Sequence, residues 1–360
     1  MNIQHTSNVY IGTYANQQDP GIFLYTLDTD TGTLTYIDSI AGIENPSFLA
    51  HDQQQRYLYA VSETLEYQGQ AGGSVATFAI DNQAGQLTFL NQQPTLGEDP
   101  CFLTLDGNQR FLVLNNYTGG SICLYPLQAN GEIGPLADKI QHHGSSLDPQ
   151  RQSSAHPHSC TFDPAGNAFL VADLGLDKII TYHIDAEQQK FIYQAETASK
   201  PGAGPRHMAF HPSKNYAYVI NELASTITAY SFDPITCTLD PIQSITTLPV
   251  GFTGTNTCAD IHIHPTGAFL YGSNRGHDSI AVFALEQQTG KLSAIAHSSS
   301  GGKCPRNFAL TPGGKFLLAA NQQTNNVVTF AIDPTNGTLT ATGDAIQLPQ
   351  PVCIKIMGDQ

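Results

Sequence analysis

The sequence predicts an all-β fold, a seven-bladed β-propeller with four antiparallel strands in each blade, and three observations carry this prediction. A hairpin signature recurs seven times along the 360 residues. A second hairpin, opened in most cases by a proline, precedes six of those copies. The two ends of the chain hold complementary strands of one further unit. Repeats of this kind, built from short strands, are typical of propellers.

The recurring hairpin is an apolar strand that ends near Asp or Glu, a short polar turn that often contains Gly, and a second apolar strand. Clear copies read TFAIDNQAGQLTFL and TFAIDPTNGTLTAT. Alternating runs around such turns predict β-hairpins. The seven copies occupy residues 23–37, 77–90, 124–136, 181–193, 229–242, 282–295 and 329–342. No segment shows a sustained helical period, so we expect almost no helix.

The preceding hairpin begins at an anchor residue that is usually proline. Turns such as those in FDPAGNAFLVAD and FHPSKNYAYVINE follow each anchor. The anchors recur at a spacing of roughly 45–57 residues, which is the length of one propeller blade. A β-sandwich would not repeat one four-strand unit seven times. The six anchors are Pro46, Pro100, Pro157, Pro205, Cys258 and Pro305.

The seventh blade is split between the two ends of the chain. Pro351 opens the last strand, VCIKIM, and the strands NVYIGTY, GIFLYTLD and TLTYIDSI stand at the N-terminus. Pairing of these segments would close the ring. We therefore expect residues 1–360 to form a single seven-bladed domain.

The composition of the chain excludes some classes of binding partner. The formal net charge is −15, from 15 basic and 30 acidic residues. Phosphate backbones and anionic membranes demand a basic surface, so we expect no nucleic-acid partner and no membrane partner. A small anionic ligand needs only a local positive pocket. The sequence leaves the oligomeric state open.

The seven cysteines form no C-x-x-C pair, and their number is odd. Reduced cysteines in a cytoplasmic protein are the expected state, in agreement with a polar start that does not resemble a secretory signal. We expect no metal and no cofactor, since H-E-x-x-H, Walker and G-x-S-x-G patterns are absent. The loop that carries His142 and His143 is expected to be mobile.

The repeat register places two rings of residues around one mouth of the central channel. The first ring lies one residue after each anchor, and the second lies at the end of the strand that returns to the same face. The first ring is Ser47, Cys101, His158, Arg206, Ala259, Arg306 and Val352. The second ring is Tyr14, Glu63, Tyr117, Leu174, Glu222, Arg275 and Gln322.

Arginine is scarce in this chain, yet three of its six arginines fall on the two rings. Arg206, Arg275 and Arg306 belong to consecutive blades, His158 belongs to the blade before them, and Glu222 shares the blade of Arg206. Arginine offers a planar fork of donors that suits phosphate or carboxylate. The arc predicts an anion site with His158 as a general acid or base.

The blocks GAGPRHMAFHP, YVINEL and CADIHIHPTG resemble the cycloisomerase-2 type of 6-phosphogluconolactonase, a family of seven-bladed propeller lactonases. The resemblance extends along essentially the whole chain, and residues 202–222 are its most specific part. The family is similar to the fungal carboxy-muconate lactonizing enzymes. Their proposed active site is a His, two Arg and a Glu. The resemblance therefore implies catalytic roles for His158, Arg206, Glu222 and Arg275.

Other candidates surround this set. Arg206, Arg275 and Arg306 are expected to bind substrate, and His156 is a second candidate for the histidine. Asp260, with His262 on the same strand, suggests a buried hydrogen-bonded link between blades, and Asp260 is also a candidate substrate ligand. His207 is expected to be structural.

The resemblance implies hydrolysis of 6-phospho-D-glucono-1,5-lactone to 6-phosphogluconate, a step of the pentose phosphate pathway. The motif fits both branches of the family, so a muconate-type cycloisomerase or lactonizing enzyme remains an alternative. A non-catalytic ligand-binding propeller is a third hypothesis, because a propeller alone does not define an activity.

Overall fold

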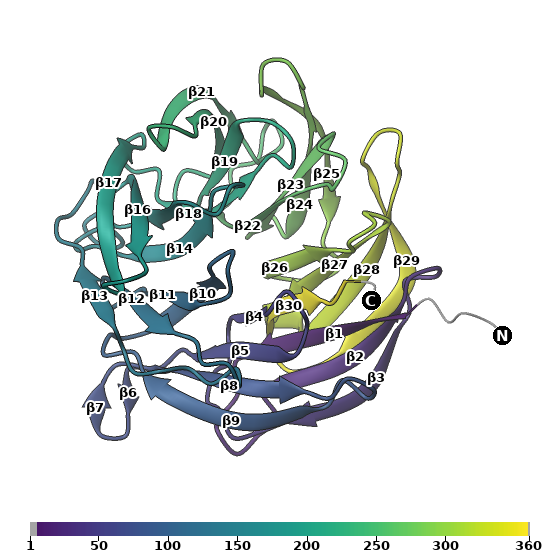
Figure 1. Ribbon diagram of the computed structural model, residues 1–360. Helices are drawn as coiled ribbons and strands as arrows, with labels where there is room; N and C mark the ends of the chain where they lie inside the picture. Colours follow the sequence, from purple (N-terminus) through teal and green to yellow (C-terminus); the bar gives the residue numbers. More distant parts are fainter. Residues whose placement is uncertain (1–5, 359–360) are drawn as a thin grey trace.

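Seven four-stranded antiparallel sheets surround a central channel in the computed structural model, which describes residues 6–358 (Figure 1). The predicted propeller is confirmed. The innermost strands are β4 (Leu49–His51), β10 (Pro100–Leu105), β14 (Pro157–Phe162), β18 (Pro205–Phe210), β22 (Thr257–Ile263), β26 (Pro305–Leu310) and β30 (Pro351–Ile356). The second strands are β5 (Tyr57–Ser62), β11 (Phe111–Asn116), β15 (Phe169–Asp173), β19 (Tyr216–Asn221), β23 (Phe269–Arg275), β27 (Phe316–Asn321) and β1 (Thr6–Thr13).

The outer half of each blade is the recurring hairpin. Its first strands are β8 (Ser74–Ile80), β12 (Ser121–Pro126), β16 (Lys178–Asp185), β20 (Thr226–Asp233), β24 (Ser279–Leu285), β28 (Asn326–Ile332) and β2 (Ile22–Asp28). Its second strands are β9 (Leu87–Pro94), β13 (Asp138–Gln141), β17 (Lys190–Ala198), β21 (Thr238–Thr246), β25 (Leu292–Ser299), β29 (Leu339–Gln347) and β3 (Leu34–Ile40). A small hairpin, β6 (Glu66–Tyr67) with β7 (Gln70–Ala71), and the 3-10 turn η1 (Gln322–Thr324) complete the elements.

The ring closes as the sequence predicts. The seventh sheet has the order β3-β2-β1-β30, so the C-terminal strand lies against the first strand of the chain. Figure 1 shows the yellow β30 beside the purple β1. Ile11 pairs with Ile354, and both are buried. No described helix is long and apolar enough to cross a membrane.

The recurring acidic residue of the hairpin builds its turn. The Asp81 carboxylate accepts hydrogen bonds from the backbone N–H groups of Gln83 and Ala84, at 2.9 and 2.6 Å. Such Asx turns favour the reversal of the chain. Gly85 follows with φ of 69°, a conformation that suits glycine. The same carboxylate contacts recur at Asp28, Asp185 and Asp233.

Buried tyrosines tie each of several blades to the next. The hydroxyl of Tyr218 donates to the carbonyl of Gly290, in the hairpin turn of the next blade, at 2.9 Å. Equivalent bonds join Tyr10 to Gly85, Tyr59 to Gly131 and Tyr271 to Gly337. Apolar side chains fill the space between neighbouring sheets, and a buried hydroxyl needs a partner there. The repeated sequence therefore specifies both the hairpin turn of each blade and its packing against the neighbouring blade.

One hairpin differs from its prediction. The segment 124–136 of the second blade was expected to hold both outer strands, but β13 begins at Asp138. Ile133 makes only an isolated bridge to Leu127. Pro135 has no N–H to donate to a ladder, so regular pairing resumes only after it.

Candidate functional site

A repeated β-bulge directs the first ring of residues into the channel mouth. Pro205 pairs with Asn221 and His207 pairs with Ile220, which leaves Arg206 as the extra residue between them. Bulges turn a side chain away from the direction that regular pairing would give it. Equivalent bulges occur in four other blades. Their extra residues are Cys101, His158, Arg306 and Val352.

A backbone hydrogen bond holds the second ring beside the first. The N–H of Glu222 donates to the carbonyl of Gly204, the residue before the anchor, at 2.7 Å. Equivalent bonds fix Glu63, Tyr117, Leu174 and Gln322. Gly204 has φ of 64°, and a Cβ at this position would lie 2.6 Å from the Leu223 side chain. Gly204, the second glycine of GAGPR, is therefore required by this close approach and by its positive φ.

Three arginines converge on the carboxylate of Glu222. Its Oε2 lies 3.0 Å from Nε of Arg206 and 2.9 Å from Nη2 of Arg275. Its Oε1 accepts from Nη2 of Arg151 at 2.5 Å. Glu222 and Arg206 are buried, whereas 39% of the Arg151 side chain is exposed. We call these residues, together with Arg306, the arginine cluster.

Arg306 is held more loosely than the other arginines. Its Nη2 lies 3.9 Å from Oε1 of Glu63, and its guanidinium carbon lies 5.5 Å from the centroid of the Tyr14 ring. The Tyr14 hydroxyl donates to Glu63 at 2.8 Å, and the Ser47 hydroxyl also contacts this carboxylate. Arg306 makes no hydrogen bond with the described residues, so its donors are free for a ligand.

The cluster keeps an excess of positive charge. Among the described residues, its four guanidinium groups form ion pairs with two carboxylates, those of Glu222 and Glu63. Protein carbonyls occupy some donors, since Arg206 Nη1 donates to Ala259 at 2.6 Å and Arg275 Nη2 donates to Cys258 at 2.8 Å. Nε of Arg206 lacks the alignment of a hydrogen bond to Glu222, and Nε of Arg275 is also buried without a partner. Both Nε atoms are shielded from solvent, so an anionic ligand would bind through the outer guanidinium nitrogens of the cluster.

Burial and neighbouring charge set the protonation states. Burial alone would raise the pKa of Glu222, but Arg275, Arg206 and Arg151 outweigh it and lower the pKa to about 2. Burial, with Arg275 and Arg306, lowers the pKa of Arg206 to about 10. At neutral pH the carboxylate is therefore ionised and the guanidinium protonated.

His158 lies beside the cluster as a neutral base. Burial, followed by the charges of Arg206, His207 and Arg306, holds its pKa well below the usual value. Its Nδ1 lies 3.8 Å from the Cys101 sulfur, and no described group hydrogen-bonds its Nε2. A neutral imidazole with a free nitrogen can accept a proton from water.

His156 lies at the rim of the mouth. Its ring stacks on Tyr117 at 4.5 Å between centroids, and its Nδ1 lies 2.8 Å from the Tyr117 carbonyl. The hydroxyl of Tyr117 accepts from Arg151 at 3.2 Å. His156 therefore supports the wall of the mouth, and its Nε2 contacts only Ser154, at 3.4 Å.

The structure does not bring Asp260 into the arginine cluster. It belongs to a second layer of the channel, formed by residues that directly follow the first ring. Nδ1 of His207 lies 2.8 Å from the Asp260 carboxylate, and the other nitrogen of His207 lies 3.2 Å from Nη1 of Arg206. Burial, followed by Arg206, lowers the pKa of His207 to about 4. Five residues of the second layer line one recess: Phe48, Phe102, His207, Asp260 and Asn307.

Arg151, Glu63 and Tyr117 were missed as site residues from the sequence. Glu63 and Tyr117 held ring positions but carried no assigned role. Arg151 lies in the long loop 141–157, which the repeat register does not place. The sequence did contain a sign of its role, because Arg151 stands in the longest insertion at the face of the propeller that carries the two rings.

The same loop corrects another prediction. His142 is buried, its Nδ1 lies 2.7 Å from Asp173, and its Nε2 lies 2.9 Å from the Tyr182 hydroxyl. The expectation of mobility at His142 is therefore wrong, because buried contacts of both ring nitrogens, with Asp173 and Tyr182, anchor it. Residues 6–358 contain no group of three His, Cys, Asp or Glu side chains arranged to hold a metal ion.

The fold and this mouth define a seven-bladed propeller with a cationic channel mouth. The chain belongs to the family described as "Lactonase, 7-bladed beta-propeller", which matches residues 8–356. It is 35% identical to the 6-phosphogluconolactonase of Bacillus subtilis over 348 residues, 97% of each chain. It is 34% identical to the 6-phosphogluconolactonase of Formosa agariphila over 319 residues, 84% of this chain and 86% of the relative.

Solved structures agree. A crystal structure from Bacteroides fragilis, provisionally named a 6-phosphogluconolactonase, superposes with a TM-score of 0.91 at 33% identity and covers 99% of both chains. The periplasmic gluconolactonase of Pseudomonas aeruginosa superposes with a TM-score of 0.92 at 30% identity, over 98% of this chain and 99% of the other. The predicted family is confirmed.

Proposed function

We propose that this chain hydrolyses 6-phospho-D-glucono-1,5-lactone to 6-phosphogluconate. The observation that carries the proposal is the excess positive charge of the arginine cluster beside a neutral His158. A phosphate monoester carries a charge of about −1.5 to −2 at neutral pH, which matches a formal excess of two in the cluster. The names of the relatives in Bacillus subtilis and Formosa agariphila support the choice of substrate.

In this proposal the arginines divide the work by how free their donors are. Arg306 binds the phosphate, since it makes no hydrogen bond with the described residues. Arg206 and Arg275 have donors left beside Glu222 and polarise the lactone carbonyl. Arg151 orients Glu222 from the loop. Preorganised donors of this kind stabilise the negative charge that develops on the carbonyl oxygen.

His158 supplies the proton transfers. Its free nitrogen takes a proton from a water molecule while the water oxygen bonds to the lactone carbon. The ring C–O bond then breaks, and the leaving oxygen takes the proton back from the imidazolium. The imidazole ends neutral and the product is a hydroxy acid. A lowered pKa suits this cycle because the imidazole starts in its neutral form.

A second candidate is a gluconolactonase that acts on the unphosphorylated lactone. The periplasmic gluconolactonase of Pseudomonas aeruginosa favours it, because its fold matches over almost the whole chain. A muconate-type cycloisomerase or lactonizing enzyme is a third, because the arginine cluster also suits dicarboxylates. Arg306 separates these options, since only a phosphorylated or doubly charged substrate needs its donors.

The deciding experiment measures acid release from fresh 6-phosphogluconolactone, in parallel with glucono-1,5-lactone and a muconate. We expect turnover well above spontaneous opening for the phosphorylated lactone, unchanged by a chelator. A rate equal to spontaneous opening would remove this function. Preference for the unphosphorylated lactone would select the second candidate, and loss of muconate absorbance would select the third.

The proposal includes a cytoplasmic location and a place in the pentose phosphate pathway. All seven cysteines are free, and six of them are buried. Free cysteines in this number are typical of a reducing compartment. Cell fractionation tests the location, and recovery of the protein in the periplasm would contradict it.

A further inference from the structure

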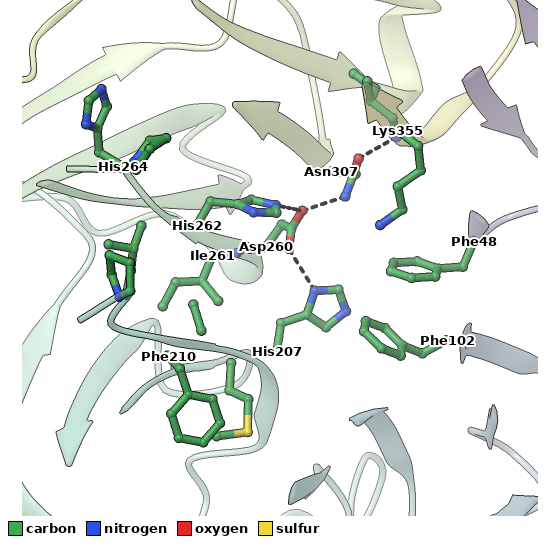
Figure 2. Close-up of a pocket in the computed structure, with 16 residues that line it drawn as sticks. Phe48, Phe102, His207, Phe210, Asp260, Ile261, His262, His264, Asn307 and Lys355 are labelled. Atoms are coloured by element: carbon green, nitrogen blue, oxygen red, sulfur yellow. Dashed lines mark hydrogen bonds and ion pairs between the residues drawn. The ribbon is translucent and has the colours of Figure 1, made fainter. Parts of the chain in front are cut away.

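A recess of about 310 Å³ lies in the channel below the arginine cluster (Figure 2). Residues of the second layer and residues further along the inner strands line the recess, and Met208 and Ile261 belong to its apolar walls. Figure 2 shows Phe48 and Phe102 on one side and His262 on the other.

The recess is distinct from the arginine cluster. None of the cluster residues lines it. Between the two lie packed rings, with centroids of Phe48 and Phe102 4.2 Å apart and those of Phe102 and His207 5.3 Å apart. The ring of His158 follows, 5.2 Å from His207. A molecule in the recess would therefore not touch Arg206, Arg275 or Arg306.

Asp260 at the centre of the recess is already saturated. Its carboxylate contacts Nδ1 of His207 at 2.8 Å, Nε2 of His262 at 3.0 Å and the amide nitrogen of Asn307 at 2.5 Å (Figure 2). A backbone N–H, that of Ile261, adds a further bond at 2.9 Å. The carboxylate has no capacity left for a ligand.

The other polar walls are satisfied as well. The second nitrogen of His207 lies 3.2 Å from Arg206, and the amide oxygen of Asn307 accepts from the Ile354 N–H at 2.7 Å. Both nitrogens of His264 have partners, at 2.8 and 2.9 Å. Two groups alone remain open among the described polar residues of the recess: the ammonium of Lys355 and Nδ1 of His262.

These two open groups have complementary chemistry. The ammonium of Lys355 lies 4.4 Å from the centroid of the Phe48 ring and makes no hydrogen bond or ion pair with residues 6–358. An ionised Asp260 can only accept, so the neutral tautomer of His262 that fits this contact donates through Nε2 and presents Nδ1 as an acceptor. The His262 side chain is 38% exposed, which leaves this nitrogen accessible.

We propose that the recess is a second binding site, for a small hydroxy acid. The carboxylate of the ligand pairs with Lys355, a hydroxyl donates to Nδ1 of His262, and the carbon skeleton lies against Phe48 and Phe102. A simple anion would leave the His262 acceptor unused, and a neutral sugar would leave Lys355 unpaired. The site rests on the contacts of the recess and does not require the proposed lactonase activity.

The test uses methionine methyl signals, because the chain has only three methionines and Met208 lines the recess. The full-length protein, labelled at its methionine methyl groups, is titrated with millimolar D-gluconate and, as the neutral control, D-glucose. The Met208 signal is assigned with Met208→Leu. We expect gluconate to move it and glucose to leave it in place.

Matched variants locate the ligand. The gluconate shift should disappear in Lys355→Gln, fall at least fivefold in His262→Phe, and persist in Arg306→Ala. Circular dichroism and thermal unfolding check that Lys355→Gln folds, and Lys355→Leu replaces it if it does not. The proposal is overturned if gluconate leaves Met208 unmoved, if the shift survives in Lys355→Gln, or if Arg306→Ala abolishes it.

Discussion

The two levels of the channel are built from adjacent residues of the same inner strands, yet they have opposite electrostatic character. In the arginine cluster, Arg206 and Arg306 belong to a set of four cations that outnumber their carboxylates. One residue further on, His207 and Asn307 contact the single carboxylate of Asp260, which His262 and a backbone N–H saturate. The difference teaches that a repeat fixes where side chains point, whereas individual residues decide which charges a level presents and which of them stay unpaired.

Removal of His158 should have the largest effect on activity. We expect His158→Ala to lower kcat for the phosphorylated lactone by about 10²–10⁴-fold with little change in KM, because general acid–base catalysis contributes on that scale. Steady-state kinetics on the folded variant measures this. A kcat within a factor of a few of the parent protein would show that the cluster works without this base.

The pH dependence of kcat is a second test of the role of His158. Burial and then the charge of Arg206 hold its pKa well below its usual value, so the neutral form persists as the pH falls through about 6.5. With glucono-1,5-lactone, which does not titrate here, kcat should stay level from pH 7.5 to 6. A decline centred near the ordinary histidine value would contradict the assignment.

Removal of Arg306 should have the next largest effect. Arg306→Ala is expected to raise KM for the phosphorylated lactone by about 10–100-fold, the value of a lost charged hydrogen bond. The same variant should change KM for the unphosphorylated lactone much less. Kinetics with both lactones measures the difference, and equal losses would place the phosphate elsewhere in the cluster.

His207 links the two levels, because it contacts Arg206 in the arginine cluster and Asp260 in the recess, and a change at Asp260 tests this link. Asp260→Asn should raise KM about tenfold, because an amide can select the wrong tautomer of His207 and turn its protonated nitrogen toward Arg206. His262→Gln is the matched control, since it removes the other imidazole partner of Asp260. If both variants show the same KM, the tautomer of His207 does not matter.

Lys355 should have the smallest effect on activity. Lys355→Gln is expected to keep kcat/KM for the lactone within twofold, because Lys355 contacts the Phe48 ring and no residue of the arginine cluster. A loss of tenfold or more would show that the two levels are one site. Steady-state kinetics under the conditions used for Arg306→Ala gives the comparison.

Much of the architecture could be predicted because its determinants are local. Asp81 and Gly85 specify their turn within five residues, and each anchor specifies the inner strand that follows it. The register then placed Arg206, Arg275 and Glu222 at one mouth. The β-bulge explains why this placement holds, since it directs the residue after the anchor into the channel.

The remaining features depend on contacts between distant segments. Arg151 reaches Glu222 from a loop whose path depends on how Gln152 and His142 are buried, and no periodicity describes that path. The shared carboxylate of Asp260 joins residues from three blades. Such pairings follow from side-chain packing in the closed ring, which a single sequence does not display.

The closure of the ring has a consequence for synthesis of the chain. Strand β1 pairs with β30, so the first blade strand to leave the ribosome finds its last partner only when residue 356 has emerged. Until then β1 presents an unpaired edge, and such edges promote association with other chains. A truncation that removes β30 should therefore leave the edge of β1 unpaired and the protein permanently prone to association.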